Sequence, residues 1–275
     1  GMDERGVIDA TDRPSTPTSL VADLRSIGVE SGMTLMVHAS LSKLGYVAGG
    51  AHAVVLALLD SVGPGGTLVM PTHSGDLTDP GSWSNPPVPA DWCDEIRDGM
   101  PAYDASLTPT RGMGAIVECF RHVPEVRRSG HPTVSAAAVG PNAAFVTDDH
   151  RLPDGLGEHS PQARLYELDG HVLLLGVSHA NNTSLHLAER RSAPAGAVHR
   201  PQSSPIMVAG ERTWVTYDCL DDDSADFGTI GEAFAATGAE RAGPVGNTTC
   251  RLMRSREIVD FATAWMNEHR SWRTR

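Results

Sequence analysis

Apolar and polar positions follow one another along the chain in blocks that predict strands alternating with helices. A short apolar run at 34–37 predicts a buried strand, and the mostly apolar stretch 51–62 predicts a helix. That helix is expected to end at the Gly- and Pro-rich turn 63–66, before a second strand at 67–70. This strand–helix–strand order predicts an α/β fold with a largely parallel or mixed sheet covered by helices.

The remaining blocks extend this alternation over the whole chain. Further helices are expected at 20–27, 112–122, 183–191, 230–237 and 256–268, and further strands at 134–139, 172–177, 213–219 and 248–252. Residues 71–109 interrupt the alternation with many prolines and several aromatic and acidic residues, which predicts a long, ordered excursion facing a ligand. Residues 1–15 are expected to be a loose tail. No linker divides the chain, so we predict a single domain over 1–275.

Composition narrows the classes of partner. The 275 residues include 34 acidic and 22 basic side chains, a formal net charge of −12. Such a charge argues against a nucleic-acid or anionic membrane partner and suits a cationic small molecule. No apolar stretch reaches the ~20 residues of a membrane span, and the N-terminus lacks a signal-peptide core. The four cysteines are scattered without metal-ligand or disulfide spacing, which predicts a cytoplasmic protein.

Two histidines stand where predicted strands end. His38 directly follows the strand at 34–37, and His179 follows the strand at 172–177. Ligands of open α/β sheets bind at that edge, so we expect a chemical site there. His179 is the predicted general base, since an imidazole with an ordinary pKa of about 6.5 suits proton abstraction near neutral pH. Glu158, Glu189 and 221–223 remain alternatives for the carboxylate that orients it, and a purely capping role for His179 stays open.

Several common signatures are missing from the sequence. It contains no G-x-S-x-G nucleophile elbow, no P-loop and no G-x-G-x-x-G turn after a strand. Closely spaced His and Asp residues of the usual metal-binding patterns are also missing, so no metal is expected. A metal-dependent amide hydrolase and a non-catalytic acidic protein that binds cationic compounds are kept as alternatives.

Eight sequence blocks, in order, resemble the aminoglycoside 3-N-acetyltransferases, also called the antibiotic N-acetyltransferase family. The blocks lie within residues 20–265, at 38–45, 63–73, 100–104, 108–114, 128–132, 157–161, 179–189 and 246–252. The resemblance implies a three-layer α/β/α fold with long irregular insertions. It also implies acetyl transfer from acetyl-CoA to the 3-amino group of an aminoglycoside in a ternary complex, and thereby antibiotic resistance.

The resemblance further implies roles for individual residues. His179 would be the catalytic base and Glu158 the acid near the reacting amine. The chemistry of the turn before the helix adds Thr183 or a backbone N–H as the donor to the oxyanion. The coenzyme A wall is expected at His38, Ala39, Ser40, Leu41, Ser42, Gly45, Thr110, Arg111, Met113, Gly114, Arg128, Ser129, His131 and Ser135. The acids that hold the polycationic acceptor are expected at Asp76, Asp104, Glu158, Asp221, Asp222 and Asp223. Residues 205–245 are expected to vary with the acceptor, and a monomer and a homodimer are both compatible with the sequence.

Overall fold

The computed structural model describes residues 3–274, which form strands and helices in alternation, as the sequence pattern predicts. The strands are β1 (Thr34–Ala39), β2 (Thr67–Pro71), β3 (Arg127–Arg128), β4 (Ala136–Val139), β5 (His171–Leu175), β6 (His199–Val208), β7 (Glu211–Leu220), β8 (Arg241–Val245) and β9 (Thr248–Arg254). The helices are α1 (Glu4–Asp9), α2 (Pro17–Ser26), α3 (Gly50–Val62), α4 (Cys93–Gly99), α5 (Ala115–Phe120), α6 (Ala143–Thr147), α7 (Pro161–Glu167), α8 (Ser184–Ser192), α9 (Phe227–Ala235) and α10 (Ser255–His269).

A seven-stranded mixed sheet forms the centre of the fold. Its strand order is β3-β4-β2-β1-β5-β9-β8. Strand β1 pairs in parallel with β2 and β5. The pairs β2–β4, β3–β4, β5–β9 and β8–β9 are antiparallel. The three parallel strands therefore end at one edge of the sheet. That edge is where residues following β1, β2 and β5 can meet.

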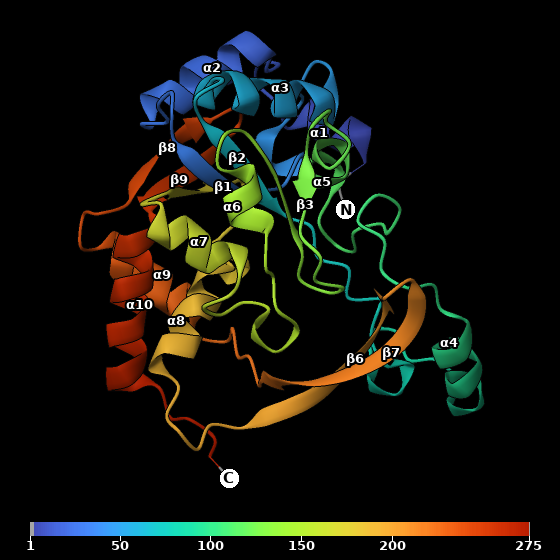
Figure 1. Cartoon of the computed structure of the whole chain (residues 1–275). Helices are drawn as coiled ribbons and strands as arrows, with labels where there is room; N and C mark the ends of the chain where they lie inside the picture. The colour runs from blue at the N-terminus through green and yellow to red at the C-terminus, as the bar shows by residue number, and fades with distance from the viewer. Residues whose placement is uncertain (1–2, 275) are drawn as a thin grey trace.

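Helices cover both faces of this sheet, which confirms the predicted three-layer architecture (Figure 1). On one face α2, α3 and α5 bury an apolar cluster that includes Leu20, Leu58 and Phe120. On the other face α6 to α10 bury a second cluster that includes Leu185 and Phe227. Burial of apolar surface on both faces is what holds this mixed sheet between its helices.

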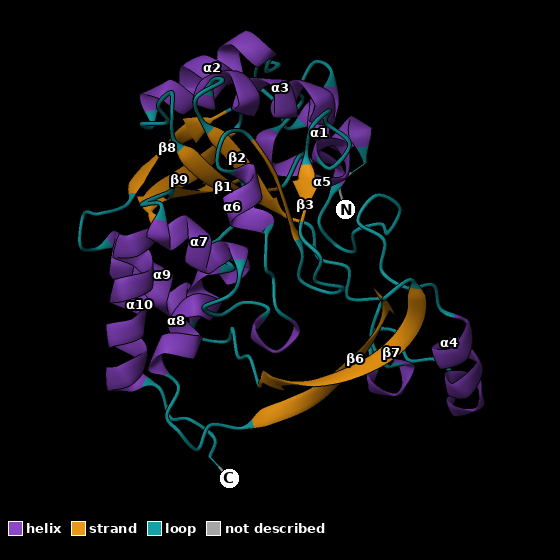
Figure 2. Cartoon of the chain, in the orientation of Figure 1, coloured by secondary structure: helices purple, strands orange, loops and turns teal. Residues whose placement is uncertain are grey.

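Strands β6 and β7 form a long two-stranded ribbon that is separate from the sheet (Figure 2). The proline-rich excursion at 71–109 is attached to this ribbon, because the backbone N–H of Tyr103 donates to the carbonyl of Pro205 over 2.9 Å. The Arg212 guanidinium also donates to the carbonyl of Met100 over 2.7 Å. The excursion is therefore ordered, as predicted, and contains α4.

Three predictions about secondary structure were wrong or incomplete. The tail at 1–15 is not loose throughout, since Asp3 accepts a hydrogen bond from the Gly6 N–H and caps α1. Strand β6 was missed because its sequence is largely polar and contains two prolines, and its pairing with β7 supplies the order. Helix α7 lies between the strands predicted at 134–139 and 172–177, where no element was predicted. Within residues 3–274, no helix has both the length and the apolar character needed to cross a bilayer.

Candidate active site

A cleft of about 550 Å³ opens at the edge where β1, β2 and β5 end. It is lined by Val37, His38, Ala39, Ser40, Leu41, Ser42, Pro71, His73, Gly112, Met113, Gly114, Ala115, Val117, Val177, Ala180, Asn181, Thr183 and His186. The lining therefore combines two strand ends, the start of α5 and the first turn of α8. This is the expected location of a ligand site in an open α/β sheet.

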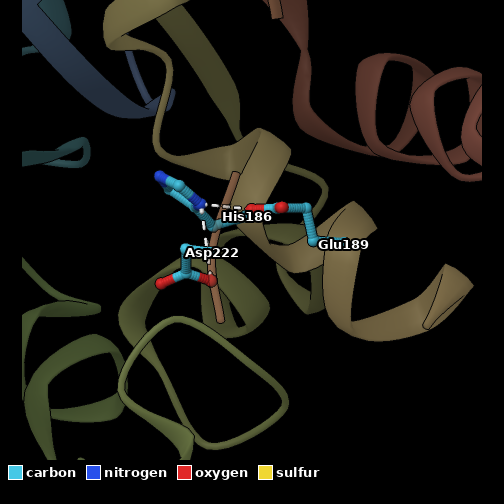
Figure 3. Close-up of side chains that lie close together, drawn as sticks. All are labelled: His186, Glu189 and Asp222. Carbon is cyan, nitrogen blue, oxygen red and sulfur yellow. Dashed lines mark hydrogen bonds and ion pairs between the residues drawn. The ribbon is translucent and has the colours of Figure 1, made fainter. Parts of the chain in front are cut away.

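His186 is the cleft residue with the clearest acid–base geometry. It lies on α8, where a spacing of three residues places Glu189 beside it. The His186 Nδ1–H donates to Glu189 Oε1 over 2.5 Å. The ring also packs edge-on against Phe227, with ring centroids 4.9 Å apart. Because Nδ1 carries the proton, the lone pair of Nε2 is free, and Figure 3 shows this nitrogen facing away from the carboxylate.

Glu189 is held in turn by groups from distant parts of the chain. Its side chain is fully buried, and its Oε2 accepts from Arg270 Nη1 over 2.6 Å and from the Asp223 backbone N–H over 2.9 Å. Arg270 also donates to Asp226, so the guanidinium is fixed on two sides. A buried carboxylate requires such pairing, and the result is a rigid partner for the His186 imidazole.

Asp222 lies beside His186 and Glu189 (Figure 3). Its Oδ1 lies 3.8 Å from His186 Nδ1 and is bonded to Arg190. Among the described residues, His186, Glu189 and Asp222 have ligand atoms within 4.8 Å of one another, a spacing that could hold a metal ion. The guanidinium groups of Arg190 and Arg270 already pair with these carboxylates, and their positive charge opposes a cation. The arrangement fits an acid–base pair better than a metal centre.

His179, the predicted base, lies outside the cleft lining. It is 6% exposed, and its Nε2–H donates to Glu240 Oε1 over 2.6 Å. Its Nδ1 accepts from the amide of Asn182 over 3.3 Å. Glu240 is also bonded to Arg251 over 2.7 Å. Both ring nitrogens of His179 are therefore occupied, which leaves no lone pair for a substrate proton.

The carboxylate that orients His179 is Glu240, which is not among the alternatives that the sequence left open. Burial alone raises the pKa of Glu240, but the hydrogen bonds from His179 and Arg251 outweigh burial and hold that pKa below its usual value. Glu158 is instead exposed, and its Oε1 accepts from Arg191 Nε over 2.8 Å. Glu189, another of these alternatives, is buried and accepts from His186 instead.

The residues predicted for the coenzyme wall fall into three sets: residues that line the cleft, three that lie elsewhere, and four that form a polar network. His38 to Ser42, Met113 and Gly114 line the cleft together. Gly45 does not: a Cβ there would lie 2.7 Å from the Asn247 Cβ, so close packing accounts for this glycine. Thr110 bonds to Glu118, and Arg111 pairs with Asp76 over 2.7 Å at a smaller, neighbouring pocket.

The third set forms a polar network away from the cleft. Arg128 donates to the hydroxyls of Thr72 and Ser135, and to the Thr108 carbonyl. The Ser129 hydroxyl bonds to His150, and His131 bonds to the Leu152 carbonyl and accepts from the Val134 N–H. The structure therefore does not place these four residues in one wall with His38, as was predicted for Arg128, Ser129, His131 and Ser135. Their polar atoms fix the strand β4 and its loops.

Thr183 does line the cleft, one helical turn before His186. Its hydroxyl oxygen accepts from Gln162 Nε2 over 2.9 Å, and both side chains are buried. This bond fixes the hydroxyl, whose only other hydrogen bond within residues 3–274 is a long one to Met36 Sδ at 3.9 Å. Its O–H is thus available to a stronger acceptor in the cleft.

The acids predicted for the acceptor side already have partners in the chain. Asp76 pairs with Arg111, and Asp221 with Arg200 over 2.9 Å. Asp104 accepts from the N–H groups of Ser106 and Leu107, and Asp223 accepts from that of Ala225. Asp222 is the member of the set that approaches the acid–base pair at the cleft.

Both the sequence and the fold of this chain match those of known proteins. The profile of the aminoglycoside 3-N-acetyltransferase family matches residues 36–267. The chain is 45% identical to the SPbeta prophage-derived aminoglycoside N(3')-acetyltransferase-like protein YokD of Bacillus subtilis, over 94% of this chain and 95% of that protein. The crystal structure of YokD superposes with a TM-score of 0.94, covering 97% of this chain and 99% of that one.

Two further relatives extend the comparison. Aminoglycoside N(3)-acetyltransferase VII of Streptomyces paromomycinus is 38% identical over 97% of this chain and 96% of its own. The structure described as AAC-IIIb binary with CoASH is 32% identical and gives a TM-score of 0.82, covering 93% of this chain and 97% of that one. These matches, together with the sheet and its cleft, show that the chain is an acyltransferase of the aminoglycoside 3-N-acetyltransferase family.

Proposed function

We propose that this protein transfers the acetyl group of acetyl-CoA to the 3-amino group of an aminoglycoside in a ternary complex, and that this reaction confers resistance. The observation that carries the proposal is the His186–Glu189 pair, which presents a free imidazole nitrogen to the cleft. Glu189 holds the Nδ1 proton and stabilises the imidazolium that forms when Nε2 accepts a proton. General-base catalysis of this kind contributes about 10²- to 10⁴-fold to a rate.

The base in this proposal is His186 rather than the predicted His179. A general base needs an unoccupied nitrogen within reach of the proton that it removes. His186 meets that requirement, whereas both nitrogens of His179 are bonded within the protein. We assign to His179 and Glu240 the task of holding the turn before α8, on which Thr183 and His186 follow.

Acetyl-CoA would occupy the side of the cleft formed by 38–42 and 112–115. Small side chains and exposed backbone there leave room for the pantetheine arm. The related structure with CoASH supports a coenzyme site in this fold. The Thr183 hydroxyl would donate to the developing oxyanion, an interaction of about 3–4 kcal/mol for each well-placed donor.

The acceptor would approach from the side of Asp222 and the β6–β7 ribbon. Aminoglycosides are polycations, and the net charge of −12 favours their capture. Asp222 lies 3.8 Å from His186 Nδ1, so an ammonium group near this carboxylate would place a neighbouring amine close to the base. The related Streptomyces enzyme, named as an aminoglycoside N(3)-acetyltransferase, supports this class of acceptor.

The test is acetyl-CoA-dependent thiol release by purified protein with a panel of aminoglycosides, followed by mass spectrometry of the product. We expect release with at least one aminoglycoside and a single added acetyl group. His186→Gln is expected to abolish release while binding of coenzyme A, measured by calorimetry, is retained. Coenzyme A binding without release from any aminoglycoside would refute the proposed acceptor, and no binding of either compound would refute the proposed function.

A further inference from the structure

Two histidines of the cleft have no role in the mechanism described above. His38 is the fifth residue of β1, and His73 lies two residues beyond the end of β2. Both line the same cleft as His186. The Nε2 atom of each is buried and has no hydrogen-bond partner in the described part of the chain. His38 itself is only 7% exposed.

Unpartnered buried nitrogens of this kind cost stability in the free protein. A half-buried histidine shows the usual solution: His150 bonds through Nδ1 to the Ser129 hydroxyl over 2.8 Å and through Nε2 to the Gly155 carbonyl over 2.6 Å. Burial lowers the pKa of both His38 and His150 to about 3, yet only His150 is paired at Nε2. The unpaired nitrogen of His38 is what a ligand in the cleft would complete.

The surroundings of His38 indicate what kind of ligand atom that is. Burial first, and then the nearby His73, His179 and His186, lower the pKa of His38. The His38 ring is therefore neutral near neutral pH. Among the described residues that line the cleft, none is Asp or Glu. A wall without carboxylates suits an uncharged group that carries hydrogen-bond acceptors better than it suits an ammonium group. A thioester carbonyl is such a group, and a neutral imidazole N–H is a suitable donor for it.

We propose that His38 is a catalytic residue whose neutral Nε2–H donates a hydrogen bond to the thioester carbonyl oxygen of the acyl donor. This inference rests on the proposed acetyl transfer. His38 is suited to the task by its place on the central strand β1, which pairs with β2 on one side and with β5, leading to α8, on the other. The imidazole N–H of His38 therefore lies between His73, which follows β2, and α8, which carries His186.

The chemical step balances as follows. The neutral amine attacks the carbonyl carbon, a C–N bond forms, and the carbonyl π electrons move to oxygen, which accepts from His38 Nε2–H. His186 Nε2 takes the proton that the new C–N bond releases. When the intermediate collapses, the C–S bond breaks and the thiolate receives that proton from the His186 imidazolium. The products are the amide and coenzyme A thiol, and His38 keeps its proton throughout.

The experiment compares His38→Leu, His38→Gln and the matched His150→Leu. For His38→Leu we expect a kcat for thiol release that is lower by about 10²- to 10³-fold, the usual effect of losing an oxyanion donor. Coenzyme A affinity is expected within about threefold of wild type, because the loss falls on the transition state. The melting temperature is expected to be no lower than that of wild type, since no bond is lost. His38→Gln is expected to recover at least tenfold of the lost kcat, because its amide supplies an N–H donor.

His150→Leu is expected to melt at a lower temperature, because it breaks two internal hydrogen bonds. A His38→Leu enzyme with kcat within threefold of wild type would overturn the proposal. So would a loss of kcat that parallels a loss of coenzyme A affinity, since that result makes His38 a binding wall, or a His38→Gln enzyme no faster than His38→Leu. Wild-type protein that binds coenzyme A and transfers no acetyl group would instead overturn the proposed function on which the inference rests.

Discussion

Residues 3–274 contain two histidine–glutamate pairs with a buried carboxylate, and the pairs differ at one ring nitrogen. His186 with Glu189 and His179 with Glu240 each join an imidazole to a carboxylate over about 2.5 to 2.6 Å. In each pair an arginine neutralises the carboxylate from the other side, Arg270 in the first and Arg251 in the second. The difference lies at the second ring nitrogen. It faces the cleft in His186 and is bonded to Asn182 in His179.

This difference separates a chemical role from a structural one. A buried pair of this type fixes the tautomer and the orientation of the imidazole in both places. Only a ring with a free nitrogen at a cleft can exchange a proton with a substrate. Burial and a carboxylate partner are therefore insufficient signs of a catalytic histidine, and the second nitrogen decides.

The largest effect is expected from His186→Ala. Loss of a general base lowers kcat by about 10²- to 10⁴-fold. The melting temperature is expected to change by only a few degrees, because Glu189 keeps its bonds to Arg270 and to the Asp223 N–H. Steady-state thiol release and differential scanning fluorimetry measure the two quantities. Near-wild-type turnover would remove His186 from the mechanism.

Glu240→Gln is expected to have the reverse signature. Breaking a buried ion pair costs about 3–5 kcal/mol in the free energy of unfolding. The kcat of the folded fraction is expected to stay within tenfold of wild type, because neither residue lines the cleft. Denaturant unfolding together with thiol release makes the comparison. A stable Glu240→Gln protein that has lost turnover would return the catalytic role to His179.

The third prediction concerns histidines without a carboxylate partner. Burial, as the first cause, lowers the pKa of His150 to about 3. Below pH 6.5 the unfolded chain binds a proton there and the folded chain does not, so acidification favours unfolding until the pH reaches about 3. His150→Leu removes that proton uptake, and the loss of unfolding free energy per pH unit between 6 and 4 should be smaller by about 1.4 kcal/mol. Denaturant melts at several pH values check the slope, and an unchanged slope would contradict the assignment.

The smallest effect is expected from Glu158→Gln. This exposed carboxylate pairs with Arg191, and exposed ion pairs contribute only about 0.2–1 kcal/mol to stability. We expect kcat within threefold of wild type across the aminoglycoside panel. A tenfold or larger loss of kcat would restore the acid role that the family resemblance implied for Glu158.

Local signals in the sequence were sufficient for most of the fold. The apolar runs of β1, β2 and β5 and the Gly-Pro turn after α3 predicted a sheet covered by helices and the sheet edge at which the cleft lies. The three-layer architecture was implied by the family resemblance. The polar strand β6 was beyond such signals, because its order comes from pairing with β7. The wall at 38–42 and 113–114 was predicted from the family blocks, and the structure gathers those residues in one cleft.

The acid–base pair was harder to predict because its decisive contacts are distant in sequence. The spacing of His186 and Glu189 on one helix face was visible, but Glu189 was one of several alternatives for the carboxylate that orients His179. Its burial depends on Arg270, 81 positions later. The pairing of His179 with Glu240 spans 61 positions and has no local signal. Side-chain pairing of this range becomes visible only once the helices are packed.

The bond between Arg270 and Glu189 has a consequence for how the enzyme is made. His186 and Glu189 are synthesised together, but the cation that holds their carboxylate arrives only with the residue that follows α10. A nascent chain therefore carries the catalytic pair long before it can hold the pair in place. In the proposed mechanism, a product of premature termination before Arg270 would contain every residue that lines the cleft, but its Glu189 Oε2 would be left with the Asp223 N–H as partner.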